Sequence, residues 1–527
     1  MGKLPIGVQS FEKIINDGFV YADKTEYIQK LLNGGKVYFL SRPRRFGKSL
    51  FLSTLKAYFE GRKELFSGLK IYDFEEKSPS SWEKYPIIYI SFAKGDFKKE
   101  TGLSDAISYS LEENAKKFDV KLINNGSFGI QLFDLIKSVQ EKTGKEVVVL
   151  IDEYDKPLLD NLAVNEIREE ENRETLKGFY GALKDADEYL KFVFITGVTK
   201  FSKVSLFSDL NQLEDISLSE EYAGICGITE EELENTFASE IEALAKKNDI
   251  SVEECIEELK KNYDGYHFSA GGIGVYNPFS LLNCFSNKDF ERYWFATGTP
   301  TILINAIMKS GRPIEDMSEG ISATKDRMEN FRADQSDFVP LFYQSGYISI
   351  VGYDKKFRSY KLAFPNNEVE YGFLEVIIPL ASPKYEAPDD AFSSEKMTGY
   401  LENCDVDSFM TMIKALLASL PYYEGEAPSN EQQWRNVVYA IFKILGQYVH
   451  AEVHSARGRS DCIVETGSFV YIFEFKQDKT SGEALSQIDE KGYGIPFISS
   501  GKKIVKIGAN FSTELRTLDD WKVEKSC

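Results

Sequence analysis

VYFLSRPRRFGKSLFLSTLKAYFEG, residues 37–61, predicts a strand, a loop and a helix in succession. Its first five residues form a short apolar run, and its last twelve carry apolar side chains at helical spacing. The loop between them ends in Gly47, Lys48 and Ser49, the second half of the phosphate-binding pattern G-x-x-x-x-G-K-[ST]. Arg42 stands where that pattern has its first glycine. The sequence therefore predicts a phosphate loop with an altered beginning.

Several residues of this loop have an expected role in binding ATP with Mg²⁺. Gly47 lets the backbone approach the phosphates closely, Lys48 supplies a cation to the outer phosphates, and Ser49 is expected to ligate the metal. Arg42, Arg44 and Arg45 are expected to clamp phosphate oxygens in place of the missing glycine, with Arg42 and Arg45 as the cofactor-binding pair. Alternatively, the loop's arginines bind a partner or nucleic acid next to the loop.

The loop lies in a basic island of an acidic protein. The formal net charge is −20, yet residues 36–63 contain eight Lys or Arg side chains against Glu60 alone. Such a run can be a solvated face, but its position around the loop favours an anion site. The overall charge argues against a protein that coats nucleic acid indiscriminately.

A second apolar strand ends in acidic residues, in the segment VVVLIDEYD at 147–155. Asp152 is expected to hold Mg²⁺ through water, and Glu153 to orient or polarise the attacking water. The alternative is an ordinary helix cap after a strand. Thr196, at the end of the apolar run KFVFITG, either senses the γ-phosphate or belongs to a simple turn. We favour a nucleotide site, because a strand–GKS–helix unit and a strand ending in two acids occur together.

The chain is long enough for about three domains. Continuous apolar strands alternate with helices in residues 1–217, which predicts an α/β domain with a parallel sheet covered on both faces. Residues 218–420 are expected to form a mostly helical middle domain with a small winged element. Residues 430–527 show a compact α-β-β-β-α-β pattern, which predicts a small α/β domain.

The C-terminal pattern contains a second set of acidic and basic residues, in GRSDCIVETGSFVYIFEFKQD at 458–478. Alternation predicts a hairpin in which Glu474 and Lys476 share one face, with Asp461 brought close across the pair. Two carboxylates and a lysine at one strand end suit Mg²⁺ binding and phosphodiester cleavage. The alternative for E-F-K is an exposed salt bridge. On the next helix, Gln487 and Lys491 share a face at i,i+4 spacing.

The chain resembles the AAA-ATPase-like family of bacterial proteins, whose members commonly carry a C-terminal nuclease-like domain. The resemblance rests on GVQSFEKIINDGFVYADKTEYIQKLL, FLSRPRRFGKSLFLSTLKAYFEG, VVVLIDEYDKPL and FITGVTKFSKVSLFSDLNQLEDISL. It implies that R-P-R-R-F-G-K-S is the usual form of the loop. The C-terminal segment resembles the PD-(D/E)xK nuclease superfamily, in which Asp461 matches the first acid, Glu474 and Lys476 the E-x-K, and Glu431 the extra helix carboxylate. Tyr493 departs from the Q-x-x-x-Y element of some relatives, because it lies six residues after Gln487.

The remaining composition fits a cytoplasmic protein with no membrane partner. Its apolar runs are short and broken by charge, and its N-terminus has no apolar run of signal-peptide length. Six scattered cysteines without a C-x-x-C pair indicate reduced thiols. The sequence leaves the oligomeric state open.

The function that these features favour is an ATP-regulated, Mg²⁺-dependent nuclease acting on DNA or RNA through its C-terminal domain. The alternative is a nucleotide-switch or signalling protein whose nuclease-like domain is a non-catalytic binding module. A pure ATPase motor ranks behind both, since the sequence shows no clear arginine finger.

Overall fold

The computed structural model describes most of the 527 residues. The described ranges are 2–77, 82–122, 126–162, 164–200, 206–207, 210–295, 314–329, 337–380, 393–418, 430–446, 450–453, 462–515 and 517–525. At 377–380, 430–433, 435 and 450–453 the description extends to the backbone only.

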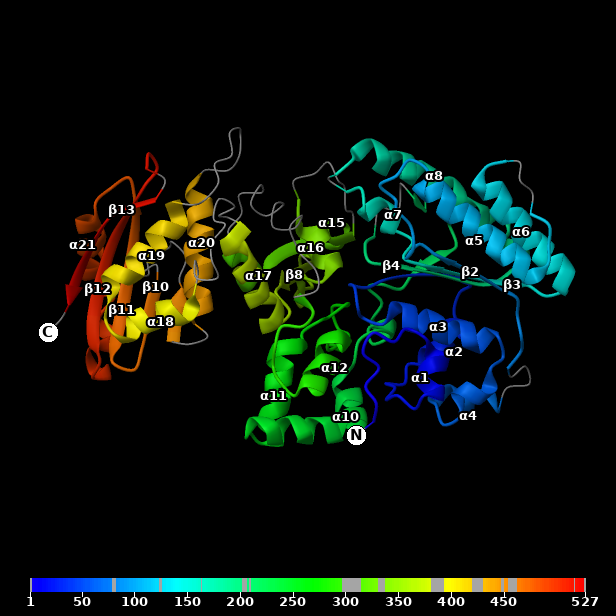
Figure 1. Ribbon diagram of the computed structural model, residues 1–527, viewed down its shortest axis with the longest axis horizontal. Helices are drawn as coiled ribbons and strands as arrows, with labels where there is room; N and C mark the ends of the chain where they lie inside the picture. Colours follow the sequence, from blue (N-terminus) through cyan, green and yellow to red (C-terminus); the bar gives the residue numbers. More distant parts are fainter. Residues whose placement is uncertain are drawn as a thin grey trace. The chain divides into compact units, whose positions relative to one another are not determined.

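The chain forms two compact units (Figure 1). Unit 1 contains Met1–Thr297 and Ile321–Glu368, and unit 2 contains Gly298–Gly320 and Val369–Cys527. The segment expected as a separate middle domain, 218–420, thus contributes to both units. The three-domain division with boundaries at 217 and 420 stays a prediction.

A five-stranded parallel sheet forms the centre of unit 1, with strand order β2-β3-β4-β1-β5. The strands are β1 (Val37–Ser41), β2 (Ile87–Ser91), β3 (Val147–Asp152), β4 (Leu190–Gly197) and β5 (Leu213–Asp215). Strand β3 is buried along its whole length, as its continuous apolar sequence predicts for a sheet covered on both faces. All five strands point the same way, so the ends of β1, β3 and β4 meet at one edge.

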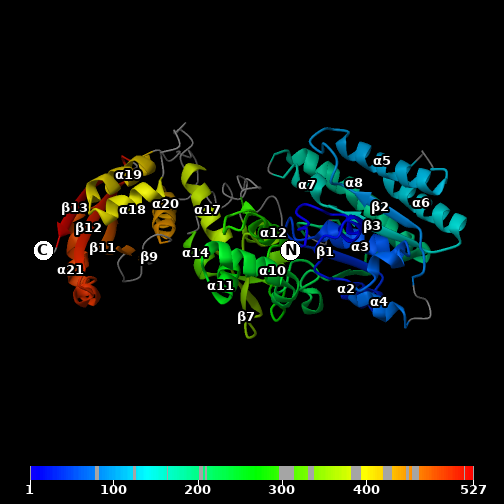
Figure 2. The same cartoon turned by 60° about the horizontal axis from the view of Figure 1, so that its bottom comes forward.

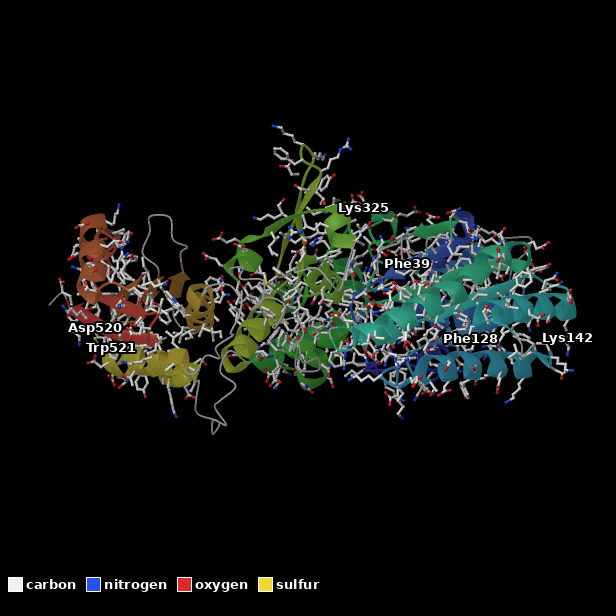
Figure 3. All side chains as sticks on the ribbon, turned by 90° about the horizontal axis from the view of Figure 1, so that it is seen from above. Phe39, Phe128, Lys142, Lys325, Asp520 and Trp521 are labelled. Carbon is white, nitrogen blue, oxygen red and sulfur yellow. The ribbon has the colours of Figure 1, made fainter. Side chains whose placement is uncertain are left out.

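Helices cover both faces of this sheet, with α5, α6 and α8 on one face and α1 to α4 on the other (Figure 1). Their bounds are α1 (Phe11–Asn16), α2 (Glu26–Asn33), α3 (Lys48–Phe59), α4 (Lys70–Glu75), α5 (Gly102–Phe118), α6 (Phe128–Thr143), α7 (Lys156–Leu159) and α8 (Glu166–Asp185). Between the layers, Phe39 of β1 meets the rings of Tyr154 and Phe207 at centroid distances of 5.3 and 5.6 Å; Phe39 is labelled in Figure 3. Aromatic packing of this kind fixes the strand that leads into the loop.

The rest of unit 1 consists of a helical group and a small antiparallel sheet (Figure 2). The helices are α10 (Glu230–Asn248), α11 (Val252–Tyr263) and α12 (Pro278–Asn287), packed around a shared apolar core. The second group comprises β6 (Ile321–Thr324), α15 (Lys325–Glu329), α16 (Val339–Ser345), β7 (Ser349–Asp354) and β8 (Ser359–Ala363). Its three strands have the order β6-β8-β7 and lie in the segment where a small winged element was expected.

Unit 2 carries a five-stranded sheet of order β13-β12-β11-β10-β9. Its elements are α14 (Glu315–Glu319), α17 (Asn367–Leu380), α18 (Ser394–Glu402), α19 (Val406–Ala418), α20 (Asn430–Leu445), β9 (His450–Val453), β10 (Cys462–Glu465), β11 (Phe469–Gln477), α21 (Ser481–Lys491), β12 (Lys503–Ser512) and β13 (Thr517–Lys525). Strands β11 and β12 are parallel and are joined through α21, whereas the other neighbours are antiparallel. The expected α-β-β-β-α-β pattern is present, and β13 adds a strand that the sequence pattern did not predict.

No helix in the described part of the chain is both long enough and apolar enough to cross a lipid bilayer.

Candidate functional site

The loop after β1 has the backbone geometry of a tight anion-binding turn. Gly47 lies in the left-handed region at φ 95°, where an L side chain would be strained, and Arg45 has a φ of 68°. Helix α3 starts at Lys48, so its N-terminal N–H groups face the loop. The Lys48 ammonium donates to the carbonyls of Arg42 and Pro43, at 2.8 Å each. Burial lowers the pKa of Lys48, while nearby carboxylates such as Asp155 oppose that shift.

Arg42 points away from the inside of the loop. Its guanidinium donates to the carbonyls of Ser41 at 2.9 Å, Ser217 at 2.8 Å and Tyr222 at 3.1 Å, and the side chain is buried. It also lies 4.0 Å from the ring centroid of Phe268. Arg42 therefore ties the loop to residues about 175 positions later. The predicted phosphate clamp by Arg42 stays a prediction that this geometry does not favour.

Arg44 and Arg45 are the loop's exposed cations. The Arg45 guanidinium lies 4.0 Å from the ring centroid of Phe279, and the Arg44 carbonyl accepts a hydrogen bond from the Trp294 indole at 3.2 Å. Phe46, which lies between the arginines and Gly47, is buried against the rings of Tyr266 and Phe268. The loop is thus held by aromatic side chains from outside, and Arg45 remains exposed.

The end of β3 places two carboxylates beside the loop. Asp152 is buried, and burial raises its pKa against the opposing effects of the nearby Ser49 hydroxyl and the Lys48 charge. Glu153 follows with a φ of 53°, a strained conformation for a residue with a side chain. Burial raises the pKa of Glu153, and the charge of Asp152 adds to the rise. A hydroxyl and two carboxylates gathered at one strand end are a donor set that fits Mg²⁺.

Thr196 is placed differently from the expected sensor. It is buried in β4, and its hydroxyl donates to the Leu40 carbonyl of β1 at 2.9 Å. Its hydrogen bond therefore joins two strands inside the sheet. The predicted contact with a γ-phosphate stays a prediction without support from this hydrogen bond.

Lys200, which follows β4, belongs to a buried ion cluster. Its ammonium pairs with Asp215 and, at 2.5 Å, with Glu329 at the end of α15. Its backbone N–H donates to the Gln344 side chain of α16 at 2.8 Å. The segment that borders the nucleotide loop is thereby fastened to the small sheet group of unit 1.

An apolar cavity of about 80 Å³ lies beside the loop. Its wall includes Tyr21, Ala22, Gly47, Phe51, Cys226 and Ile228. These residues come from the N-terminal segment, the start of α3 and the segment before α10, which meet next to the helix N-terminus. Burial raises the pKa of the Cys226 thiol, and the one charged side chain of the wall, Lys24, is paired with Glu232.

The second candidate site lies on β11 and α21 of unit 2. The Lys476 ammonium contacts Glu474 Oε1 at 2.9 Å and donates to Gln487 Oε1 at 2.5 Å. The Gln487 amide also donates to Glu474. Glu474 is only 2% exposed. Two strand residues and one helix residue thus form a closed triangle, so E-F-K is not an exposed surface pair here.

The other two residues assigned to this site are Asp461 and Glu431. Asp461 lies outside the described residues, directly before β10, whose first residue Cys462 pairs with Phe473. Glu431 belongs to α20, but its side chain is outside the described part. Within that part, no cluster of three or more His, Cys, Asp or Glu side chains is placed to hold a metal. The metal roles of Asp461, Glu431 and Glu474 stay predictions.

Comparison with known proteins assigns the chain to a family. Residues 5–207 match the family described as "Predicted AAA-ATPase", and residues 429–521 match the PD-(D/E)XK nuclease superfamily. A protein of Azotobacter chroococcum mcd 1, called "Uncharacterized protein in vnfD 5'region", is 36% identical over 540 residues that span 99% of each chain. The chain belongs to the AAA-ATPase-like family. Its C-terminal domain belongs to the PD-(D/E)XK nuclease superfamily.

The fold class predicted for this AAA-ATPase-like protein is confirmed, with its helix-covered parallel sheet, its helical middle part and its small nuclease-like sheet. The structure of Cdc6p from Pyrobaculum aerophilum aligns with 71% of this chain and 93% of its own, at 10% identity and a TM-score of 0.22. A likeness that weak has no bearing on the fold or the function.

Asp155 is a residue of the candidate nucleotide site to which the sequence analysis assigned no role. Asp155 is buried, and its Oδ2 accepts from the N–H groups of Val198 and Thr199, at 3.0 and 2.5 Å, and from the Thr199 hydroxyl at 2.6 Å. It therefore holds the chain after β4 against the end of β3. The only feature of the sequence that pointed to Asp155 was its position three residues after Asp152. Its hydrogen-bond partners lie more than 40 positions away, so no local pattern reveals them.

We expect Asp155→Ala to lower the unfolding free energy of the AAA-ATPase-like domain by about 2–4 kcal/mol, because three buried donors lose their acceptor. Thr199→Val, which removes one of these donors, should cost about 1 kcal/mol. Urea unfolding curves of the three proteins measure both effects. The control is Asp160→Ala, which removes a partly exposed partner of Lys156 and should cost about 1 kcal/mol or less. Equal curves for Asp155→Ala and Asp160→Ala would contradict the role of Asp155.

Proposed function

We propose that this protein binds ATP with Mg²⁺ in unit 1 and that its C-terminal domain is a Mg²⁺-dependent nuclease for DNA or RNA, regulated by the bound nucleotide. The supporting observation is that one chain places carboxylate side chains beside a lysine at two separate sites. The first is Lys48 with Asp152 and Glu153, and the second is Lys476 with Glu474.

At the first site, the loop N–H groups and the Lys48 ammonium bind the phosphates. Ser49 would ligate Mg²⁺ and Asp152 would hold it through water, and the metal would neutralise part of the phosphate charge when bound. Glu153, whose raised pKa suits a group that accepts a proton, orients the attacking water. The base packs into the apolar cavity beside Gly47. In open α/β sheets, ligands bind beyond the carboxyl ends of the strands, which is where all of these groups lie.

At the second site, Glu474 contributes a carboxylate oxygen to the metal, which activates a water when it is bound. Lys476 stabilises the negative charge that develops on the phosphate. Gln487 contacts both side chains and holds Lys476 in place from the opposite helix. Asp461 and Glu431 are proposed as the companion carboxylates.

One observation favours a second candidate function. The protein has a net charge of −20, so only local basic surfaces can hold nucleic acid. This balance fits a nucleotide switch whose nuclease-like domain binds a partner without cutting.

The test is cleavage of labelled DNA and RNA by the full-length protein with Mg²⁺ or Mn²⁺, in the presence and absence of ATP. We expect cleavage whose rate changes when ATP is added, and we expect Lys48→Ala to abolish that change. Cleavage that ignores ATP would remove the regulatory part of the proposal. No cleavage under any condition, together with intact ATP binding, would favour the switch.

A further inference from the structure

The β7–β8 hairpin of unit 1 ends in a basic turn. Its sequence, SIVGYDKKFRSYKLA at 349–363, contains four cations and a single acid, Asp354. The cations are Lys355, Lys356, Arg358 and Lys361, all exposed. The structure shows none of them in an ion pair with any described residue. They therefore form a concentrated positive surface on a protein whose net charge is −20.

The turn is held in one conformation by its own hydrogen bonds. Asp354 Oδ1 accepts from the N–H groups of Lys356 and Phe357, at 2.8 and 3.1 Å. Arg358 adopts a φ of 50°, which reverses the chain. The rings of Tyr353 and Tyr360 face each other across the strands at 4.8 Å. The Asp354 carboxylate is thus engaged in backbone hydrogen bonds. The cations are therefore presented to a partner by a turn that is already formed before binding.

The same turn exposes large apolar side chains. Val351 is 49% exposed, Tyr353 38% and Phe357 69%. The Lys356 ammonium lies 5.2 Å from the centroid of the Phe357 ring. The strand β7 extends away from the neighbouring helices in Figure 2, and the hairpin projects beyond the labelled Lys325 in Figure 3. Exposed aromatic rings among unpaired cations indicate a binding surface, because folding alone gives no reason to expose them.

The base of the hairpin is firmly attached to unit 1. Ser349, the first residue of β7, accepts a hydrogen bond from the His267 N–H at 2.8 Å. The preceding helix α16 is tied to the segment that follows β4 through the bond between Gln344 and the Lys200 N–H. The basic turn is therefore presented from a rigid support.

We propose that the β7–β8 hairpin binds double-stranded DNA. A two-stranded antiparallel ribbon fits the major groove of B-form DNA, and lysines and arginines at its tip contact the phosphates on either side. The major groove of duplex RNA is deep and narrow, so a ribbon fits it poorly. This surface lies in unit 1 and is separate from the proposed nuclease site, and its binding requires neither ATP nor cleavage.

The test is fluorescence anisotropy of a labelled DNA duplex of about 20 base pairs with the full-length protein in EDTA, over a range of salt concentrations. The variant Lys355→Ala/Lys356→Ala/Arg358→Ala should bind at least about tenfold more weakly, and the slope of log K against log salt should fall by about 2–3. The control Lys116→Ala/Lys137→Ala/Lys142→Ala removes three lysines that lie beside carboxylates on α5 and α6. This control changes the net charge by the same amount as the hairpin variant and should alter the affinity for the duplex less than about twofold.

Three results would overturn the proposal: no duplex binding by the wild type, equal losses in the two triple variants, or equally strong hairpin-dependent binding of single-stranded DNA or duplex RNA. Unchanged ATP affinity and thermal unfolding in the hairpin variant would show that its weaker DNA binding comes from the hairpin itself and not from a change in the rest of the protein. Because this assay involves no cleavage, the hairpin proposal and the nuclease proposal can fail independently.

Discussion

Lys48→Ala is expected to bind ATP about 100-fold more weakly than the wild type, because a charge-assisted contact to phosphate contributes up to about 3 kcal/mol. The ammonium of Lys48 already lies among the loop carbonyls, held by Arg42 and Pro43, so it is positioned before any phosphate arrives. Burial lowers its pKa, and a bound triphosphate would favour the charged form again. Titration calorimetry with ATP and Mg²⁺ measures the affinity.

The matched control is Lys56→Ala, which removes the same charge from the same helix. Lys56 lies two turns further along α3, where its ammonium faces the Tyr89 ring at 5.7 Å. Its removal should leave the ATP affinity within about twofold of the wild type, since it does not contact the loop. Thermal unfolding of Lys48→Ala would show whether the loop carbonyls tolerate the loss of their donor. Wild-type ATP affinity in a folded Lys48→Ala protein would refute the nucleotide site.

The parts of the sites that could be predicted from sequence depend on local periodicity. Parallel strands end at the same edge of a sheet, so a strand followed by G-K-S and a strand followed by D-E had to meet there. In the structure the Ser49 hydroxyl lies near enough to Asp152 at that edge to lower the pKa of its carboxyl. Alternation along a strand likewise placed Glu474 and Lys476 on one face, and they are in contact.

The parts that could not be predicted depend on partners far away in the chain. Arg42 looks like a phosphate ligand in sequence, but the carbonyls of Ser217 and Tyr222 take up its guanidinium. Thr196 looks like a sensor, but its hydroxyl bridges to a neighbouring strand. Glu329, one of the two carboxylates that pair with Lys200, lies 129 positions later in the chain. No local pattern encodes such pairs, because they depend on how separate elements pack.

Packing between separate elements also decides the middle of the chain. A mostly helical composition after residue 218 suggested a domain of its own, and that division stays a prediction. The helices α10–α12 belong to the same compact unit as the central sheet, and the hydrogen bonds of Glu368 with Ser280 and Trp294 join distant segments within that unit. Helical periodicity reveals which face of a helix is buried, but it does not reveal which neighbour buries it.

Lys476→Ala is expected to lower the rate of Mg²⁺-dependent cleavage at least about 100-fold, because a single preorganised donor to a developing charge contributes about 3–4 kcal/mol. Its ammonium is fixed between Glu474 and Gln487, so little reorganisation is needed when charge develops on the phosphate. Gln487→Ala should give a smaller loss, since it would loosen Lys476 without removing it. The single-turnover rate on a labelled substrate that the wild type cleaves measures both effects.

The matched control is Lys503→Ala, an exposed lysine at the start of the neighbouring strand β12. In the sheet register Lys503 pairs with Phe469, five residues before Glu474, so its loss changes the charge of the same sheet away from the triangle. Its cleavage rate should stay within about twofold of the wild type. If Lys476→Ala and Lys503→Ala cut equally fast, the triangle of Glu474, Lys476 and Gln487 is a structural network. If Lys476→Ala loses cleavage while its ATP affinity stays normal, the lost cleavage is a property of the proposed nuclease site, because the proposed nucleotide site lies in the other compact unit of the chain.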